Sequence, residues 1–231
     1  MNSVFSKMMG MVLALAIAMS GAAAAEKIGI IGAGKIGGAL ARHWTHSGHE
    51  VFISSRHPEE LQALAAELGP RAHVGTPREA AAFGEVIVVS VPYSAMPQLG
   101  TDYAPELKGK IIIDTSNPIE RRDGPMAAAY QLEGAGISTA ELLHSKRVVR
   151  AFNCIPAAAL ANEANRQPER IVIPLGSDDA KALAVVRRLV DEAGFDPLVV
   201  GSLAESRQFD LGQPLASGRW SAAELRSHMT R

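Results

Sequence analysis

The sequence predicts an α/β fold with a doubly wound, largely parallel sheet and helices on both faces. Short β-branched runs alternate with helical patterns along the chain, an order typical of parallel sheets. A glycine-rich turn at residues 32–37 directly follows the first of these runs and opens a helix. The 231-residue chain shows no repeat and no low-complexity linker. We therefore expect a single domain over residues 26–231, with residues 202–231 as a C-terminal arm.

The first elements follow from local patterns. Lys27–Ile31 is a short buried strand that ends at glycine. Lys35–Ser47 has apolar residues spaced four apart and is expected to form a helix. Val51–Ile53 is the second strand, and a helix runs from Pro58 to Leu68. Further strands are expected at residues 73–74, 85–91, 110–114, 147–152, 170–175 and 196–200, and further helices at 79–83 and 178–193.

The composition excludes several functions. Lys plus Arg is 23 and Asp plus Glu is 24, so the net charge of −1 creates no field that attracts nucleic acid. Aromatic residues make up 5%, too few for a platform that stacks single strands. A single cysteine allows no internal disulfide and no cysteine-rich zinc site. We expect no metal site, because His43, His46 and His49 lie around a helix end, where the dipole favours histidine.

Residues 1–25 have the pattern of a secretory signal. One lysine precedes Glu26, Met11–Ala18 is an apolar run, and Ala23–Ala25 supplies the small residues of a cleavage site. The run is short for a membrane span, which needs about 20 apolar residues, and no other stretch reaches that length, so no integral membrane domain is expected. The pattern predicts cleavage after the alanines and a periplasmic or extracytoplasmic location. An uncleaved apolar segment would instead tether the protein, and translation from Met19 would give a cytoplasmic protein.

The glycine-rich turn predicts a dinucleotide site. Its residues are Gly32, Ala33, Gly34, Lys35, Ile36 and Gly37. Gly32 permits the tight turn, Gly34 lets the backbone approach a pyrophosphate, and Gly37 lets the helix pack close to the strand. The helix N-terminus adds free N–H groups and the positive end of the helix dipole. A Rossmann-type domain is therefore expected, with a glycine turn that binds nothing as the alternative.

The end of the second strand indicates which dinucleotide binds. NAD sites place a carboxylate about 20 residues after the glycines. Here the corresponding residues are Ser54, Ser55 and Arg56. Hydroxyl groups and a guanidinium suit a 2′-phosphate. The sequence therefore predicts NADP, and the alternative is an ordinary surface arginine.

Two further loops are expected to border the nicotinamide. Val91 and Pro92 follow one buried strand, and Ser116, Asn117 and Pro118 follow the next. Ligands of open α/β sheets bind at the carboxyl ends of the strands. Asn117 or Ser116 is therefore a candidate to bond the carboxamide. Turn formation alone is the alternative interpretation.

Several segments together resemble a known family. They are IGIIGAGKIGGALA at residues 28–41, SGHEVFISSR at 47–56, VPY at 91–93, TSNP at 115–118, RVVRAFNCIPAAALAN at 147–162 and GSLAESR at 201–207. In order and spread they resemble the deazaflavin-dependent NADP oxidoreductases, and the reductase domain of six-transmembrane metalloreductases that shares their fold.

This resemblance has consequences for the site. It implies NADPH bound by Ala33–Ile36, Ser55 and Arg56. It also implies an isoalloxazine-like ring near Asn153, Ile155 and Pro156, which belong to the matching segment at 147–162. The signal pattern, the lack of a membrane domain and the Gly/Pro-rich arm depart from the family, and they affect the choice of electron acceptor more than the NADP site.

No catalytic residue can be identified in the sequence, because it contains no Ser-His-Asp order, HExxH motif or carboxylate-rich cluster. Hydride transfer from nicotinamide to a flavin-like ring needs proximity and stacking rather than a strong acid. We expect an NADPH-dependent oxidoreductase with a deazaflavin or flavin as its small-molecule acceptor. One alternative is an imine or carbonyl reductase, although Tyr93, Tyr103 and Tyr130 are isolated and no proton donor stands out. The other is a non-catalytic NADP-binding regulatory protein.

The C-terminal arm ends in a short helix, which a Ser221–Glu224 capping box begins. The helix is expected to pack either on its own domain or on a partner subunit, and the second arrangement would make a homodimer. Cys154 is expected to be a small buried apolar residue rather than a reactive thiol.

Overall fold

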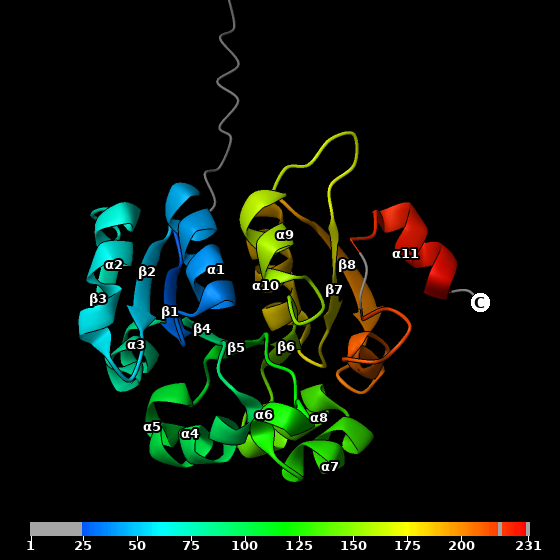
Figure 1. Cartoon of the computed structure of the whole chain (residues 1–231), viewed down its shortest axis with the longest axis horizontal. Helices are drawn as coiled ribbons and strands as arrows, with labels where there is room; N and C mark the ends of the chain where they lie inside the picture. The colour runs from blue at the N-terminus through cyan, green and yellow to red at the C-terminus, as the bar shows by residue number, and fades with distance from the viewer. Residues whose placement is uncertain (1–24, 217–218, 230–231) are drawn as a thin grey trace, which may run out of the picture.

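The computed structural model describes residues 25–216 and 219–229, so the predicted signal segment lies outside the described residues except for its last alanine. Its centre is an eight-stranded sheet in the order β3-β2-β1-β4-β5-β6-β7-β8 (Figure 1). The strands are β1 Lys27–Ile31, β2 Glu50–Ser54, β3 Ala72–Gly75, β4 Val86–Val89, β5 Ile111–Asp114, β6 Val148–Arg150, β7 Val172–Gly176 and β8 Asp196–Gly201. All neighbouring pairs are parallel except β6 and β7, which confirms the predicted fold class.

The helices lie on both faces of this sheet. They are α1 Lys35–His46, α2 Gln62–Leu68, α3 Pro77–Phe83, α4 Met96–Asp102, α5 Ala104–Leu107, α6 Glu120–Asp123, α7 Met126–Glu133, α8 Ala135–Leu142, α9 Ala157–Asn162, α10 Ala180–Glu192 and α11 Ala222–Met229. Three 3₁₀ turns accompany them: η1 Pro58–Leu61, η2 Tyr93–Ala95 and η3 Glu205–Phe209. The helix expected from Pro58 to Leu68 is therefore divided into η1 and α2.

Two predicted strands end earlier than expected, and both corrections matter for the site. The strand expected over residues 85–91 ends at Val89, since Pro92 has no backbone N–H to continue a ladder. The strand expected over residues 147–152 ends at Arg150, because Phe152 adopts the left-handed conformation with φ +59°. The residues that follow each strand are thereby free to line a cleft.

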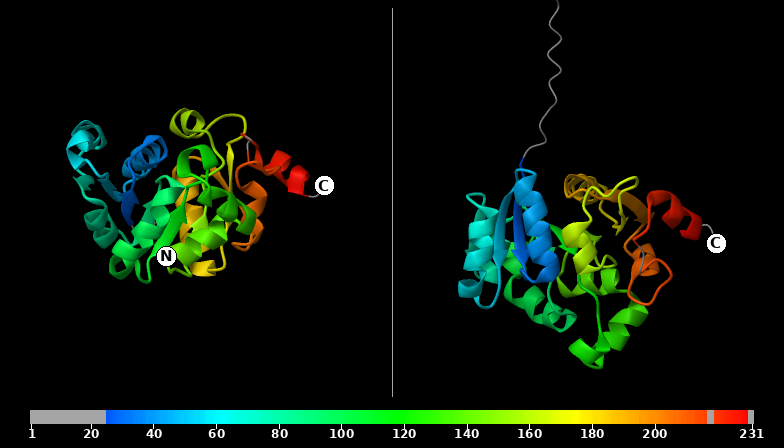
Figure 2. Two further views of the ribbon diagram at one scale, coloured as in Figure 1. Left: turned by 60° about the horizontal axis from the view of Figure 1, so that its bottom comes forward. Right: turned by 45° about the horizontal axis from the view of Figure 1, so that its top comes forward.

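Each face of the sheet has its own apolar core. On one face Trp44 of α1 packs edge-on against Phe152, with 6.2 Å between ring centroids, and Phe152 packs against Phe195 at 6.5 Å. On the other face Tyr93 and Met96 pack with residues of α3, α5 and α8. Figure 2 shows the two helical layers on opposite sides of the strands.

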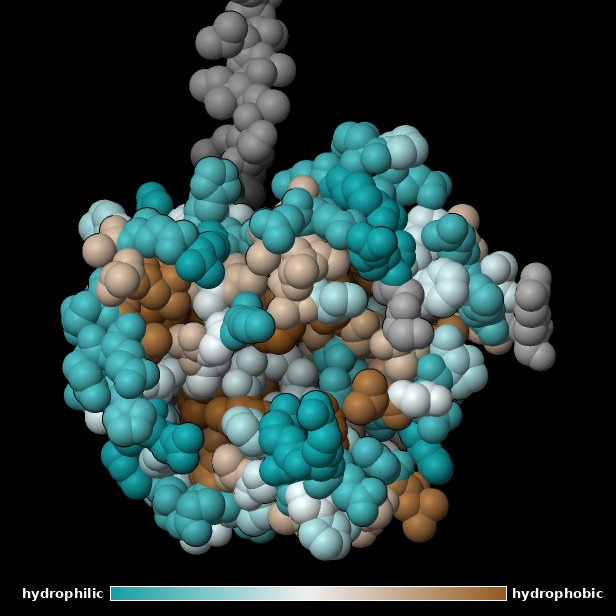
Figure 3. Space-filling model, in the orientation of Figure 1, coloured by the Kyte–Doolittle hydropathy of each residue, from teal (hydrophilic) through white to brown (hydrophobic). Residues whose placement is uncertain are grey.

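This arrangement creates a crevice. β1 is followed by α1 on the first face, whereas β4 is followed by η2 and α4 on the second. The chain thus leaves two neighbouring parallel strands in opposite directions, which opens a crevice beyond their carboxyl ends. Figure 3 shows the molecule hollowed there.

The C-terminal helix packs on its own domain. Leu225 of α11 joins Val172, Phe209 and Leu215 in a small apolar cluster at the β7–β8 side of the sheet. The predicted capping box is confirmed, since the Ser221 N–H donates to Glu224 at 2.7 Å and the Glu224 N–H donates to Ser221 Oγ at 3.3 Å. Within residues 25–216 and 219–229, no helix combines the length and the apolar character that a membrane crossing requires.

Candidate active site

Two adjoining cavities occupy the crevice at the carboxyl ends of the strands. The larger, about 800 Å³, extends from the glycine turn to the end of β2. The smaller, about 350 Å³, extends from the same turn to the loops that follow β5 and β6. Gly34, Ser90, Val91 and Pro92 line both cavities, so the two form one cleft (Figure 3). Its shape suits an elongated ligand that bends over the glycine turn.

The three motif glycines have three different reasons to be glycine. Gly32 has φ +98°, and its N–H donates to the Ser54 carbonyl at 3.2 Å. A Cβ on Gly37 would lie 2.2 Å from the Gly32 oxygen, so the close packing of α1 on β1 requires its absence. A Cβ on Gly34 would meet nothing within 4 Å. The fold therefore needs glycine at positions 32 and 37, whereas the space beside Gly34 is available to a ligand.

The start of α1 completes an anion site. Gly34 is its N-cap residue and provides no side-chain cap, and the first turn contains no acidic residue. The first N–H groups of the 12-residue helix therefore lack partners from a capping side chain and face the cleft where both cavities meet. Phosphate oxygens fit this arrangement of donors.

The residues after β2 divide into two kinds. Ser55 and Arg56 line the larger cavity, as a 2′-phosphate site requires. Arg56 is exposed and forms no ion pair with the carboxylates of the described residues, so its guanidinium is available to a ligand. The expectation that the Ser54 hydroxyl faces the ligand is wrong. Its side chain is fully buried and its Oγ donates to the Ile30 carbonyl at 2.8 Å, so it joins β2 to β1.

Some residues of the two predicted nicotinamide loops line the smaller cavity and others do not. Val91, Pro92, Ser116 and Asn117 line the smaller cavity, whereas Pro118 does not. Ile119 lies in the wall in place of Pro118, whose carbonyl accepts a hydrogen bond from Gln131. Pro156, which is expected near the acceptor ring, does not line the cavity either. It is exposed and forms the N-cap of α9, and its neighbour Ala157 lines the cavity instead.

The amide of Asn117, which lines the smaller cavity, already has protein partners. Its Nδ2 donates to the Asn153 carbonyl at 2.7 Å, and its Oδ1 accepts from Arg150 at 2.9 Å. The Ser116 hydroxyl lies 3.3 Å from the Val89 carbonyl. Asn117 therefore joins two loops of the wall, and its bond to the carboxamide stays a prediction.

Asn153 provides an unused acceptor in the same wall. Its Nδ2 donates to the Phe209 carbonyl at 2.9 Å, while its buried Oδ1 has no hydrogen-bond partner among the described residues. Phe152, immediately before it, has the strained left-handed backbone, a conformation that concentrates at functional sites. Oδ1 therefore lacks a hydrogen-bond donor, which a water or a ligand N–H would supply.

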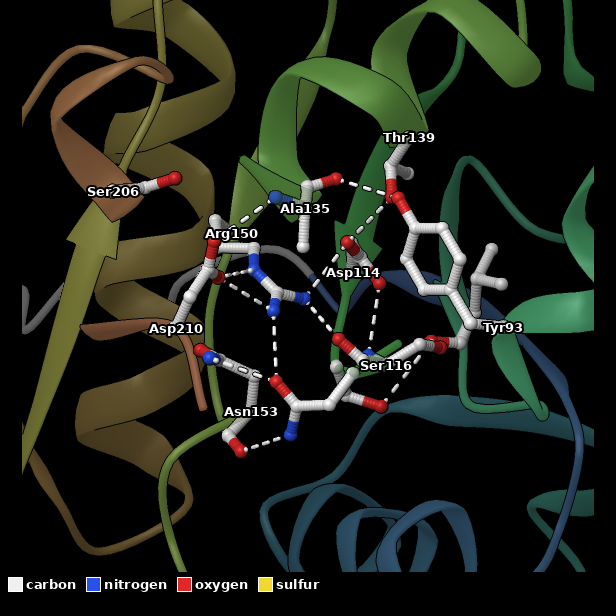
Figure 4. Close-up of polar contacts among 12 residues, drawn as sticks. Tyr93, Asp114, Ser116, Ala135, Thr139, Arg150, Asn153, Ser206 and Asp210 are labelled. Carbon is white, nitrogen blue, oxygen red and sulfur yellow. Dashed lines mark hydrogen bonds and ion pairs between the residues drawn. The ribbon is translucent and has the colours of Figure 1, made fainter. Parts of the chain in front are cut away.

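A buried ion cluster lies behind this wall, and sequence reasoning missed it. Arg150 is fully buried and contacts Asp114 at 2.9 Å and Asp210 at 2.8 Å (Figure 4). Its guanidinium also donates to the Ser116 carbonyl. Burial raises the pKa of Asp114, although Arg150 opposes that shift. The available signal was an arginine inside the otherwise apolar strand pattern of residues 148–152.

The other reactive side chains have structural partners. Tyr93 is buried, its hydroxyl donates to the Ala135 carbonyl at 2.8 Å, and burial raises its pKa. His43 contacts the Leu160 carbonyl and His49 accepts from the Glu26 N–H. No group of three candidate metal ligands occurs in the part of the chain that the structure describes. Burial raises the pKa of the Cys154 thiol to about 12, so it stays protonated.

Sequence comparisons place these features among known proteins. Residues 27–118 match the family described as NADP oxidoreductase, coenzyme F420-dependent. The chain is 30% identical over 203 residues to the F420-dependent NADP reductase of Methanothermobacter thermautotrophicus, which covers 82% of this chain and 87% of that protein. It is 34% identical over 189 residues to the metalloreductase STEAP3 of Rattus norvegicus, covering 80% of this chain but 36% of that protein. The chain thus spans about a third of the metalloreductase's length.

Solved structures support the fold assignment. A hypothetical protein of Sinorhizobium meliloti, SMa0349, has a TM-score of 0.72 at 30% identity, over 85% of this chain and 95% of that one. A putative F420-dependent NADP-reductase of Arthrobacter sp. FB24 has a TM-score of 0.68 at 24% identity, over 79% and 87%. An imine reductase of Myxococcus stipitatus, in complex with NADP⁺, has a TM-score of 0.59 at 20% identity, over 88% and 60%. The last two likenesses concern the fold alone.

Proposed function

This chain belongs to the family of coenzyme F420-dependent NADP oxidoreductases and is an NADP-dependent oxidoreductase, and we propose that its acceptor is a deazaflavin- or flavin-type ring. Bound NADPH would supply the hydride. The acceptor would occupy the smaller cavity, beyond the glycine turn. This is the part of the cleft that Ile119, Ile155 and Ala157 line with apolar surface.

The charge of the smaller cavity is the observation that carries this proposal. Its described lining includes two cations, Lys35 and Arg122, and no Asp, Glu or Tyr. An imine reductase binds a substrate that becomes a positively charged iminium and requires a proton donor. A wall that combines apolar side chains with hydroxyl and amide groups and two cations suits a planar neutral or anionic ring instead.

The chain's residues bind and orient the reactants in this proposal. Ser55 and Arg56 hold the 2′-phosphate, and the start of α1 holds the pyrophosphate. Asn153 Oδ1 accepts an N–H from the ring system in the smaller cavity, which removes an unsatisfied buried acceptor. No residue has to donate a proton, in keeping with hydride transfer between stacked rings.

An acceptor panel tests the proposal. NADPH oxidation is followed with a deazaflavin, FMN, FAD, a quinone and a cyclic imine, and with Gly34→Val protein as the control for background reaction. We expect turnover with the deazaflavin or a flavin, abolished in the variant. Turnover of the cyclic imine alone would assign the alternative reductase activity. Tight NADPH binding without turnover of any acceptor would favour a non-catalytic NADP-binding regulator.

We also propose that the domain functions outside the cytoplasm, after cleavage behind Ala25. The proposal is supported by the position of Glu26, whose N–H donates to His49 Nδ1 at 3.0 Å and whose carboxylate pairs with Arg188. Glu26, the residue after the expected cleavage point, is thus held in place by contacts within the domain. N-terminal sequencing of the natively produced protein tests this: Glu26 as first residue supports export, and Met19 or Ser20 contradicts it. The homodimer stays a prediction, which light scattering tests.

A further inference from the structure

We propose that the C-terminal arm is part of the hydride-transfer site, with Asp210 and Arg150 as positioning residues for the smaller cavity. The arm comes from the far edge of the sheet, after β8, and passes through η3 to reach the carboxyl end of β6. None of its described residues, 202–216 and 219–229, lines either cavity. It would therefore act through the loops that do. The inference rests on the proposed binding of NADPH in this cleft.

Arg150 is where the arm and the cavity wall meet. Its Nε and Nη2 donate to Asp210 Oδ1 at 3.1 and 2.8 Å. The same Nη2 donates to Asn117 Oδ1, and Nη1 donates to Asp114 and to the Ser116 carbonyl. One buried guanidinium thus connects the arm to two residues of the wall, as Figure 4 shows for the labelled side chains.

The arm has a second contact with the same wall. The Phe209 carbonyl accepts from Asn153 Nδ2 at 2.9 Å, so the arm holds the amide whose Oδ1 has no partner among the described residues. Asp210 is anchored in turn, because its Oδ2 accepts from the Ala135 N–H at 2.9 Å. Asn117 and Asn153, the two amides of the cavity wall, are therefore both positioned from one short segment, residues 209–210.

The chemistry makes such positioning consequential. A planar guanidinium bound on several sides fixes direction as well as distance, which a single hydrogen bond does not. Reaction between two stacked rings depends steeply on geometry, since a displacement of about 1 Å can cost about 100-fold in rate. Loss of the Asp210 charge would loosen the wall around the reacting rings. It would leave Arg56 and the glycine turn, at the other end of the cleft, unchanged.

The test compares Asp210→Asn with a matched control. Arg147→Gln breaks the Arg147–Asp179 pair of 2.9 Å at the opposite end of β6, away from both cavities. For each protein we would measure folding by near-UV circular dichroism, the affinity for 2′,5′-ADP, and the rate of NADPH oxidation with the acceptor that the wild type uses. A further measurement is the fluorescence of bound NADPH, which reports the surroundings of the nicotinamide without any acceptor.

We expect Asp210→Asn to lower kcat by about tenfold or more while 2′,5′-ADP affinity stays within about twofold. The emission of bound NADPH should shift towards that of free NADPH, and Arg147→Gln should leave the rate and the emission unchanged. An unchanged rate and emission in folded Asp210→Asn protein would overturn the inference. So would a parallel loss of 2′,5′-ADP affinity, which would indicate a purely structural role.

A milder variant and the acceptor-free measurement keep the test decisive. Thr139→Val removes the 2.8 Å bond from Thr139 to Asp114, the other carboxylate on Arg150. If Asp210→Asn does not fold, Thr139→Val should lower kcat and shift the emission to a smaller extent, with 2′,5′-ADP affinity unchanged. A Thr139→Val protein with unchanged kcat and emission would then overturn the inference. If none of the acceptors in the panel supports NADPH oxidation by the wild type, the proposed function fails. The emission of bound NADPH still tests the role of the arm in that case.

Discussion

The two halves of the cleft are built in different ways. The larger cavity takes its proposed binding groups, the glycine turn with Ser55 and Arg56, from one continuous β1–α1–β2 segment, while η1, α3, η2 and α4 form the rest of its wall. The smaller cavity is assembled from loops after β4, β5 and β6, and a buried Arg150 connects them to the arm. The proposed binding groups of the first half are thus close in sequence and open to a ligand, while those of the second depend on contacts between distant segments. Substitutions should separate the two halves.

The largest effect is expected at the point that both cavities share. Gly34→Val should reduce NADPH affinity by more than about 100-fold with the fold retained, because its side chain would enter the pyrophosphate space and meet no protein atom. Fluorescence titration and thermal unfolding measure the two properties. Gly37→Ala is the contrast, since its Cβ would lie 2.2 Å from the Gly32 oxygen and should lower stability instead. Unchanged NADPH affinity in Gly34→Val protein would remove the turn from the site.

The next effect concerns the larger cavity alone. Arg56→Ala should remove most of a preference for NADPH over NADH of at least about tenfold, equivalent to about 1.5–3 kcal/mol for a charge-assisted bond to the 2′-phosphate. Measured dissociation constants for both dinucleotides, with and without the substitution, check it. NADH affinity should not change. Equal affinity of the intact protein for both would refute the NADP assignment.

A pH-dependent effect is expected at the rim of the smaller cavity. Burial raises the pKa of the Asp123 carboxyl. Hydrogen bonds from the Arg122 side chain and from the backbone N–H groups of Ile119 and Ser94 outweigh burial and lower this pKa to about 2. A depressed carboxyl pKa stabilises the fold above the unfolded value near 4, and this contribution is lost as the pH falls towards 2. Asp123→Asn should therefore cost about 2 kcal/mol at pH 7 and little at pH 2. Urea unfolding across that range measures it, and a pH-independent difference would contradict this electrostatic account.

The smallest effect should distinguish acceptors. Arg122 lines the smaller cavity with a partly exposed side chain, whose guanidinium is paired with Asp123 at 2.9 Å. Arg122→Gln should raise the KM of an anionic acceptor by about threefold to fivefold, as a partly screened charge allows. The KM of a neutral quinone and the affinity for 2′,5′-ADP should stay the same. Equal changes for charged and neutral acceptors would indicate a general distortion of the rim.

Several features of the fold were not predictable from local patterns. Helices α4, α5, α7 and α8 fall in a stretch for which the sequence analysis predicts no helix. The α8 segment, AGISTAEL, consists largely of small residues, and its burial against η3 and β6 comes from the sheet rather than from an amphipathic pattern. Tertiary packing thus decides these helices, whereas α1 and α10 have the apolar spacing that makes them visible in the sequence.

The sequence by itself determined the dinucleotide half of this protein. A glycine turn and an arginine after a strand act through backbone freedom and charge that need only their own neighbours, so the roles proposed for Gly34 and Arg56 follow from their positions. The tertiary structure alone decided the other half. Asp210 lies 60 residues from Arg150 in the chain, and it is folding that buries the two together behind Asn117. A buried charge must find its partner wherever the fold places one, and no spacing in the sequence encodes that meeting.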